Sequence, residues 1–119
     1  MSQAAIESVV QAVCEGFGLE RPELADRRGQ KTPRSVRFAR GACGLLAHIA
    51  AAASISAMGR AIGYEGKYML TLTRKHRTLL RWASWPKPPR KSGAVEFREK
   101  LQTVCHRLGV DIEDLVKDP

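Results

Sequence analysis

Apolar residues recur every three to four positions along most of the chain, the spacing that buries one face of a helix. The first such stretch has six inward positions: Ile6, Val9, Val10, Val13, Cys14 and Phe17. Gly16 or Gly18 is expected to end this helix, and a short helical turn carrying Leu24 follows it. No segment alternates with period two for long enough to predict a strand. The expected fold class is therefore all-α, a compact helical bundle.

Residues 27–33 are polar, basic and rich in turn formers, so a loop is predicted there. The next helix is expected to be capped by Thr32, with Pro33 in its first turn. Its Ala-rich continuation to about Ala50 favours helix over strand.

A short helix and a longer helix are predicted between Ser54 and Trp82, joined by a tight turn at residues 63–66. Ser54 is placed to cap the short helix, and Gly63 to end it. The longer helix has six inner positions: Met69, Leu72, Thr73, His76, Leu79 and Leu80. Its opposite face carries Lys67, Thr71, Arg74, Thr78 and Arg81. This order matches a helix-turn-helix, whose second helix enters the major groove of DNA.

Three prolines, Pro86, Pro88 and Pro89, exclude a continuous helix after Trp82. The chain is predicted to hold a helix-turn-helix domain over 1–82, a Pro-rich linker over 83–93 and a C-terminal helical extension over 94–119. The extension is expected either to pack on the domain or to bind a partner, which includes a homodimer. Residues 11–24 and 102–115 share Gln, Val, Cys, Gly and Leu at matched positions. One such pair favours two unrelated helix ends over a repeat.

The charge balance points to a polyanionic partner. Lys and Arg number 20 against 12 Asp and Glu, a formal net charge of +8. Nucleic acid is the first expectation and an anionic membrane surface the second. The charge is concentrated at six positions before and within the third predicted helix: Arg27, Arg28, Lys31, Arg34, Arg37 and Arg40.

Signals for catalysis, metal binding or membrane insertion are missing from the pattern. The three cysteines (Cys14, Cys43 and Cys105) are odd in number and lack metal-ligand spacing, so buried reduced thiols are expected. The histidines are widely separated, no catalytic constellation is present, and no cofactor is expected. The first residues lack signal-peptide features and no apolar run is long enough to span a bilayer. A cytoplasmic, nucleoid-associated protein of a bacterium or phage is predicted.

Three motifs follow one another along residues 6–80. The first is Val13-Cys-Glu-Gly-Phe-Gly-Leu-Glu-Arg-Pro-Glu-Leu24, the second is Arg27-Arg28 followed by Arg34, and the third is Ser54-Ile-Ser-Ala-Met-Gly-Arg-Ala-Ile-Gly63. In this order they resemble the C-terminal DNA-binding domain of DnaA, the bacterial chromosomal replication initiator. The resemblance implies a helix-turn-helix that docks on duplex DNA, with the later arginine of the basic loop reaching the minor groove.

The recognition helix departs from that family. Its members have Gly-Arg-Asp-His-Thr-Thr-Val at the start of the helix, whereas this chain has Tyr64-Glu-Gly-Lys-Tyr-Met-Leu70. The resemblance therefore implies the fold and the docking mode, and not recognition of the replication-origin sequence. No P-loop pattern is present, so no nucleotide partner is expected.

These patterns predict a sequence-specific double-stranded DNA-binding protein that regulates transcription or replication, and not an enzyme. Eleven residues are expected to contact DNA: Arg27, Arg28, Lys31, Arg34, Arg37, Tyr64, Lys67, Tyr68, Thr71, Arg74 and Lys75. The alternative is a protein-interaction adaptor that retains the fold without reading DNA sequence. An enzyme acting on nucleic acid ranks last, because the sequence has no carboxylate cluster or metal-ligand spacing.

Overall fold

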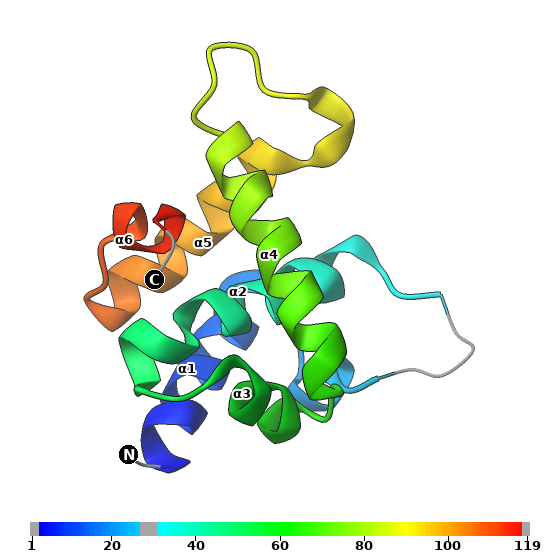
Figure 1. The fold of residues 1–119 in the computed structure, drawn as a ribbon, viewed down its shortest axis with the longest axis vertical. Helices are drawn as coiled ribbons and strands as arrows, with labels where there is room; N and C mark the ends of the chain where they lie inside the picture. The colour runs from blue at the N-terminus through cyan, green and yellow to red at the C-terminus, as the bar shows by residue number, and fades with distance from the viewer. Residues whose placement is uncertain (1–2, 27–30, 118–119) are drawn as a thin grey trace.

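The computed structural model describes residues 3–26 and 31–117, which form helices and turns and, within those ranges, no strand. The elements are α1 (Gln3–Phe17), η1 (Arg21–Leu24), α2 (Arg34–Ala51), α3 (Ile55–Ile62), α4 (Gly66–Trp82), η2 (Arg90–Ser92), α5 (Ala94–Leu108) and α6 (Ile112–Val116) (Figure 1). The elements η1 and η2 are short 3₁₀ turns. The expected all-α fold is confirmed.

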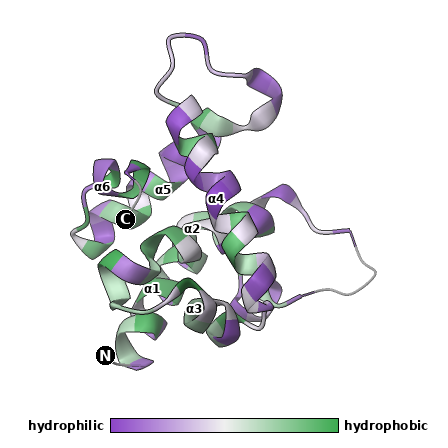
Figure 2. Ribbon diagram, in the orientation of Figure 1, coloured by the Kyte–Doolittle hydropathy of each residue, from purple (hydrophilic) through white to green (hydrophobic). Residues whose placement is uncertain are grey.

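Helix α2 is the centre of the bundle. Every residue from Phe38 to Ala47 is buried, so this part of the helix is covered on all sides. Small and apolar residues all round the helix make this burial possible, because a helix with one polar face must keep that face in water. The hydropathy colouring shows apolar residues gathered where α1, α2 and α3 meet (Figure 2). The other helices are arranged around α2.

Local end signals place most of the helix boundaries. The Ser54 hydroxyl accepts a hydrogen bond from the Ala57 amide at 3.0 Å and caps α3. Gly63 ends α3 with φ of +81°, a conformation that favours glycine over other residues. The prediction for the start of α2 is wrong by one residue. Pro33 and not Thr32 occupies the cap position, and no side chain accepts a hydrogen bond there.

The C-terminal helices pack on the other helices and share one core with them. Phe97 of α5 is fully buried, and its ring centroid lies 5.1 Å from that of Phe38 and 5.0 Å from that of His76. Helix α6 inserts Ile112 and Leu115, both buried. Residues 94–117 therefore bury apolar surface that the preceding helices would otherwise expose to water.

Helix α6 also binds Arg81, one of the cations predicted on the outer face of α4. Arg81 Nε donates to the Val116 carbonyl at 3.1 Å, and Arg81 is half-buried. The sequence pattern placed Arg81 on the solvent face with Arg74, and this prediction is wrong. Favourable contact of a cation with the last carbonyls of a helix explains the difference.

The two matched sequence segments adopt the same local structure. Gly18 and Gly109 follow α1 and α5 with φ of +69° and +70°. In each case the next amide donates to a cysteine carbonyl at 2.9 Å, Leu19 to Cys14 and Val110 to Cys105. Each segment then closes with a short turn that buries a leucine, Leu24 or Leu115. The two segments are therefore alike in how each helix ends, which agrees with the expectation of two similar helix ends and not of a repeat.

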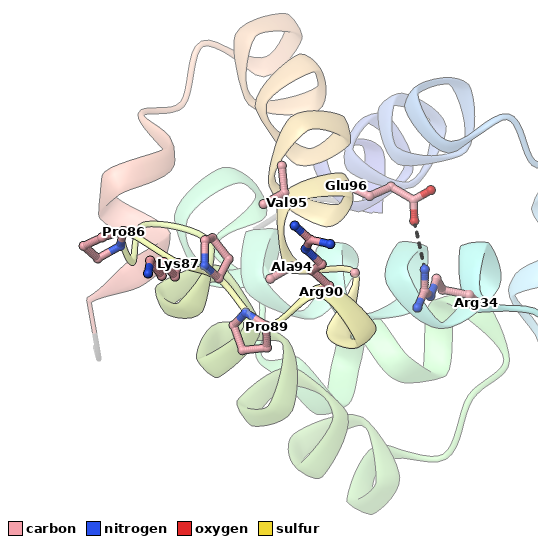
Figure 3. Close-up of a pocket in the computed structure, with 10 residues that line it drawn as sticks. Arg34, Pro86, Lys87, Pro89, Arg90, Ala94, Val95 and Glu96 are labelled. Carbon is pink, nitrogen blue, oxygen red and sulfur yellow. Dashed lines mark ion pairs between the residues drawn. The ribbon is translucent and has the colours of Figure 1, made fainter.

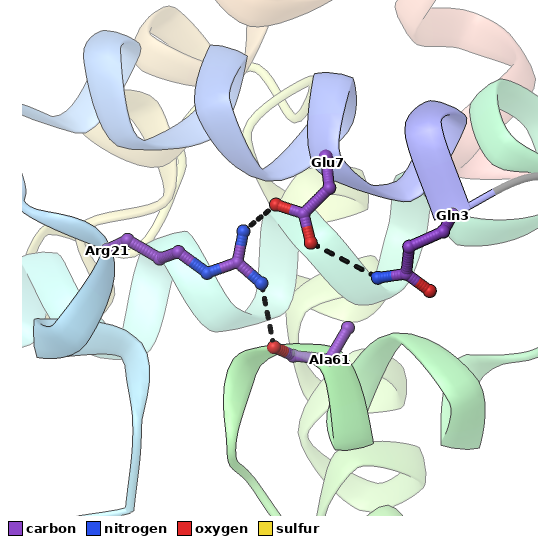
Figure 4. A network of polar contacts seen from close by, with 4 residues as sticks. All are labelled: Gln3, Glu7, Arg21 and Ala61. Carbon is purple, nitrogen blue, oxygen red and sulfur yellow. Dashed lines mark hydrogen bonds and ion pairs between the residues drawn. The ribbon is translucent and has the colours of Figure 1, made fainter.

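Arg21 joins three elements on one side of the bundle. Its guanidinium pairs with Glu7 of α1 and donates to the Ala61 carbonyl of α3 at 2.9 Å, while Gln3 donates to Glu7 at 3.1 Å (Figure 4). The charge is shared between a carboxylate and a helix C-terminal carbonyl, both favourable partners for a cation. The network fixes η1 against α1 and α3.

The contact between α2 and α4 depends on two glycines. A Cβ atom at Gly41 would overlap the imidazole of His76, and one at Gly44 would overlap the Thr73 hydroxyl and lie 3.3 Å from Met69 Cε. The absence of side chains at these two positions lets the backbone of α2 approach the buried face of α4. This close approach sets the position of α4 relative to α2.

We expect Gly44→Ala to lower the free energy of unfolding by about 1–3 kcal/mol, because the added methyl group overpacks the helix contact. This loss outweighs the gain of about 1 kcal/mol in helix propensity. Urea unfolding followed by circular dichroism measures the change. The double variant Gly44→Ala/Thr73→Ala should recover part of the loss, since it removes the overlapping hydroxyl. Equal stability of Gly44→Ala and wild type would disprove the close contact.

Candidate nucleic-acid interface

The N-terminal half of α4 is exposed on its outer side. Five of the residues predicted to contact DNA lie on this helix, and all five are exposed: Lys67, Tyr68, Thr71, Arg74 and Lys75. The hydrogen bonds that join α4 to α6 are made by Arg77 and Arg81, in its C-terminal half. The outer side of the first three turns is therefore accessible to a partner molecule.

Two residues predicted on the inner face of α4 are only half-buried. Leu72 and Leu79 lie beside the core, whereas Met69, Thr73, His76 and Leu80 are buried within it. Leu72 and Leu79 instead line a cleft between α2, α4 and η2, about 310 Å³ in volume. The buried stripe of α4 is thus narrower than the sequence pattern predicted.

We call this hollow the basic cleft, and four cations line it: Arg34, Arg37, Lys75 and Lys91. Among the described residues, its other lining side chains are neutral: Phe38, Leu72, His76, Leu79 and Ser92. Like charges gathered around one concavity produce a positive potential that attracts anions. Arg34, Arg37 and Lys75 were predicted site residues, and the fold brings them together. Lys91 was not predicted, because only the tertiary structure places it beside them.

His76 forms the inner wall of the basic cleft. Its Nδ1 lies 2.9 Å from the Leu72 carbonyl and must donate to it, since a carbonyl only accepts. The ring packs edge-on against Phe38 and Phe97. Burial lowers the pKa of His76 below its ordinary value of 6.5, and the charges of Arg37 and Lys75 act in the same direction. The hydrogen bond to Leu72 opposes this shift in part.

A second hollow continues the basic cleft toward the start of α4. We call it the tyrosine groove, which is about 200 Å³ in volume and is lined by Tyr64, Tyr68, Thr71, Leu72 and Lys75. The two hollows share Leu72 and Lys75. The ring centroids of Tyr64 and Tyr68 are 6.3 Å apart, and Lys67 Nζ lies 5.1 Å from the Tyr68 centroid. Aromatic, hydroxyl and cationic groups therefore adjoin the basic cleft.

Tyr64 also supports the fold, through a residue whose role the sequence reasoning missed. Arg40 is 3% exposed, and its guanidinium lies 4.3 Å from the Tyr64 ring centroid. Its Nε donates to the Leu24 carbonyl at 2.8 Å, and an Nη donates to the Ala25 carbonyl at 2.7 Å. The sequence pattern counted Arg40 among six cations gathered for a polyanionic partner, but its burial removes it from that set. Its buried charge is satisfied by carbonyls and a ring face.

The connection between η1 and α2 starts beside the α3–α4 turn. The Asp26 amide donates to the Gly63 carbonyl at 3.0 Å, so the chain leaves the bundle next to Tyr64. Lys31 is exposed where the structure describes the chain again. The predicted site residues Arg27 and Arg28 lie outside the described residues. The part of the connection that is described therefore begins near the tyrosine groove and rejoins α2 near the basic cleft.

Arg34, the first residue of α2, is about half exposed and has three neighbours. Its Nη1 lies 3.6 Å from a Glu96 carboxylate oxygen of α5, and its Nη2 donates to the Lys91 carbonyl at 3.1 Å. The guanidinium carbon also lies 5.7 Å from the Phe38 ring centroid. An exposed ion pair of this kind contributes little stability, about 0–1 kcal/mol. Arg34 can therefore exchange Glu96 for another anion at small cost.

The cysteines offer no reactive thiol in this structure. Cys14, Cys43 and Cys105 are buried and unpaired, as the pattern predicted. Burial raises the pKa of Cys43, and it raises that of Cys105 to about 11. These thiols are protonated at neutral pH, and the thiolate is the nucleophilic form.

Within residues 3–26 and 31–117, no group of three His, Cys, Asp or Glu side chains is arranged to hold a metal ion. None of the helices described there has the length and apolar character needed to cross a membrane. No protein-family model, curated protein or solved structure matches the chain. The resemblance to the replication initiator domain therefore stays a prediction.

The buried imidazole predicts a pH dependence of stability. Because the pKa of His76 is lowered in the folded chain, protonation favours the unfolded chain. Stability from this group is complete above the unfolded pKa of about 6.5 and is lost as pH falls from there toward the folded pKa, by up to about 1.4 kcal/mol per pH unit. Urea unfolding between pH 8 and pH 5 measures it.

The variant His76→Gln should lack this part of the pH dependence. His48→Gln, a change at an exposed position, is the matched control and should retain it. If His76→Gln and wild type lose stability in parallel as the pH falls, the imidazole is not kept neutral by the fold.

Proposed function

We propose that the chain binds double-stranded DNA in a sequence-specific manner and regulates transcription or replication. In this proposal the N-terminal half of α4 enters the major groove, and the cations of the basic cleft contact backbone phosphates. The observation that carries it is the junction of the basic cleft with the tyrosine groove. Groups suited to base edges and groups suited to phosphates then face one side of the molecule.

The side chains divide into two roles by position on α4. Tyr64 lies in the turn before α4, and Lys67, Tyr68 and Thr71 lie near the start of the helix, where a recognition helix meets base edges. Lys75 lies one turn beyond Thr71 and lines the basic cleft with Arg34 and Arg37. Cations so placed fix the register of the protein on the duplex without reading sequence. Arg74 is exposed on the adjoining side of α4 and is assigned to phosphate.

The connection at residues 27–33 is assigned to the same duplex. Asp26 at one end of it is bonded to the α3–α4 turn, and Arg34 at the other end lines the basic cleft, so both described ends adjoin the proposed interface. An arginine-rich segment beside a helix-turn-helix suits a narrow minor groove, where the negative potential is strongest. Arg27, Arg28 and Lys31 are the residues proposed for that contact. The major-groove docking mode of the replication initiator domain is part of the same proposal, with Arg34 assigned to phosphate and not to the minor groove.

Charge reversal at Arg34 tests the proposed phosphate contact. Arg34→Glu should lower affinity for duplex DNA at low salt by about tenfold and reduce the slope of log affinity against log salt by about 1. Fluorescence anisotropy titrations at several salt concentrations measure both quantities. Arg107→Glu is the matched control, because Arg107 is also half-exposed and paired with one glutamate, Glu15, on the α1 side. Equal losses for both variants would point to net charge alone.

Two substitutions on α4 separate base contact from phosphate contact. Thr71→Ala should reduce discrimination between the preferred site and unrelated duplexes by about 1 kcal/mol, with the salt slope unchanged. Lys75→Gln should weaken binding to all duplexes alike and reduce the slope by about 0.9. Selection from a random duplex pool first identifies the preferred site. The reverse pattern would contradict the assignment of the two residues.

The adaptor hypothesis makes the opposite prediction for the wild-type chain. An adaptor that kept the fold without reading DNA would show no salt-sensitive affinity for any duplex, and the random pool would yield no common sequence. Either result overturns the proposed function.

A further inference from the structure

The segment after α4 carries positive charge of which the proposed function has used only Lys91, in the basic cleft. Residues 83–93 contain Lys87, Arg90 and Lys91 and no acidic residue. All three cations are exposed, and the segment extends away from the bundle at one end of the molecule (Figure 1). No carboxylate within this segment balances these cations, and Glu96 beside it is paired with Arg34, so the cations favour an external anion.

This segment lines a hollow together with the start of α5. We call it the proline pocket, about 830 Å³ in volume, lined by Pro86, Lys87, Pro88, Pro89, Arg90 and the start of α5, with Arg34 on the far side (Figure 3). Arg34 also lines the basic cleft, and so does Lys91. The proline pocket therefore adjoins the basic cleft at Arg34, which lines both hollows.

We propose that residues 83–93 are a third DNA-contacting element, in which Lys87 and Arg90 bind backbone phosphates beyond those held by α2 and α4. The inference rests on the proposed function and extends its footprint. Lys75, Arg37, Arg34 and Lys91 line the basic cleft, Arg34, Arg90 and Lys87 line the proline pocket, and the two sets of cations, which we call the basic strip, meet at Arg34. Phosphates repeat along a duplex, so cations spread over two adjoining hollows can contact more than one phosphate.

The shape of the segment is fixed before any ligand binds. Three prolines restrict the backbone, the Ser92 hydroxyl donates to the Pro89 carbonyl at 2.6 Å, and it accepts from the Ala94 amide at 3.1 Å. A preorganised segment loses less conformational entropy on binding than a flexible one. The lysine and arginine side chains are thereby presented from a defined backbone.

Glu96 is the one carboxylate among the residues that line the proline pocket, and it lies 3.6 Å from Arg34 (Figure 3). Because Glu96 and Arg34 balance each other, the net positive charge at this end of the molecule comes from Lys87, Arg90 and Lys91. The molecule measures 38 Å along its longest axis. One turn of B-DNA spans about 34–36 Å, so the molecule is about as long as one helical turn.

The double variant Lys87→Gln/Arg90→Gln tests the inference in the full chain. For a synthetic duplex carrying the selected site, it should reduce the salt slope by up to about 1.8 and lower affinity at low salt about tenfold or more. Lys100→Gln/Arg107→Gln is the matched control, with the same change in charge. Those two residues face α1, against Phe17 and Glu15, and the control should keep the wild-type slope.

Hydroxyl-radical protection of the same duplex gives a second readout. Wild type should protect about one helical turn, and the double variant should lose protection at one end of that stretch while the base preference stays the same. If the double variant has the same salt slope and the same protection as wild type, the inference is overturned and the proposed function is not. The segment would then be assigned to a protein partner. Absence of salt-sensitive binding by the wild-type chain would overturn both the inference and the proposed function.

Discussion

The close approach of α2 to α4 determines the geometry of the surface described above. Gly41 and Gly44 have no side chains to separate the helices, so His76 and Thr73 lie directly against the α2 backbone. That contact seats the buried stripe of α4 and turns Lys75 toward Arg34 and Arg37. Larger residues at the two positions would push α4 outward. The cations of α2 and α4 would then no longer border one hollow.

Sequence-local signals predicted much of the fold. The Ser54 cap, the glycine ends at Gly18 and Gly63 and the period of the apolar positions each act within a few residues. The prediction was least accurate where a distant element decides the environment. Arg40 and Arg81 are exposed cations by sequence, yet carbonyls of η1 and α6 bind them. Neither carbonyl lies within ten residues of its arginine, so no local pattern indicates the contact.

The candidate site shows the same division. The helical spacing of Lys67, Thr71 and Lys75 identifies them as neighbours on α4 without knowledge of the tertiary structure. The position of Lys91 beside Arg34 follows only from the return of the chain through residues 83–93, and the sequence pattern gave no sign of it. Leu72 and Leu79 differ from prediction for a related reason. The side of α4 that they occupy faces a cleft where α2 and η2 diverge.

The hydrogen bond from Asp26 to Gly63 has an evolutionary consequence for the connection that follows it. Because the bundle holds both ends of residues 27–33, the cost of lengthening this connection is chiefly loop-closure entropy, about 0.6 kcal/mol for each doubling of length. Insertions there are therefore nearly neutral for folding. A lineage could vary the number and spacing of arginines in this arm while conserving the helices that support it, and so change its reach along a ligand independently of its stability.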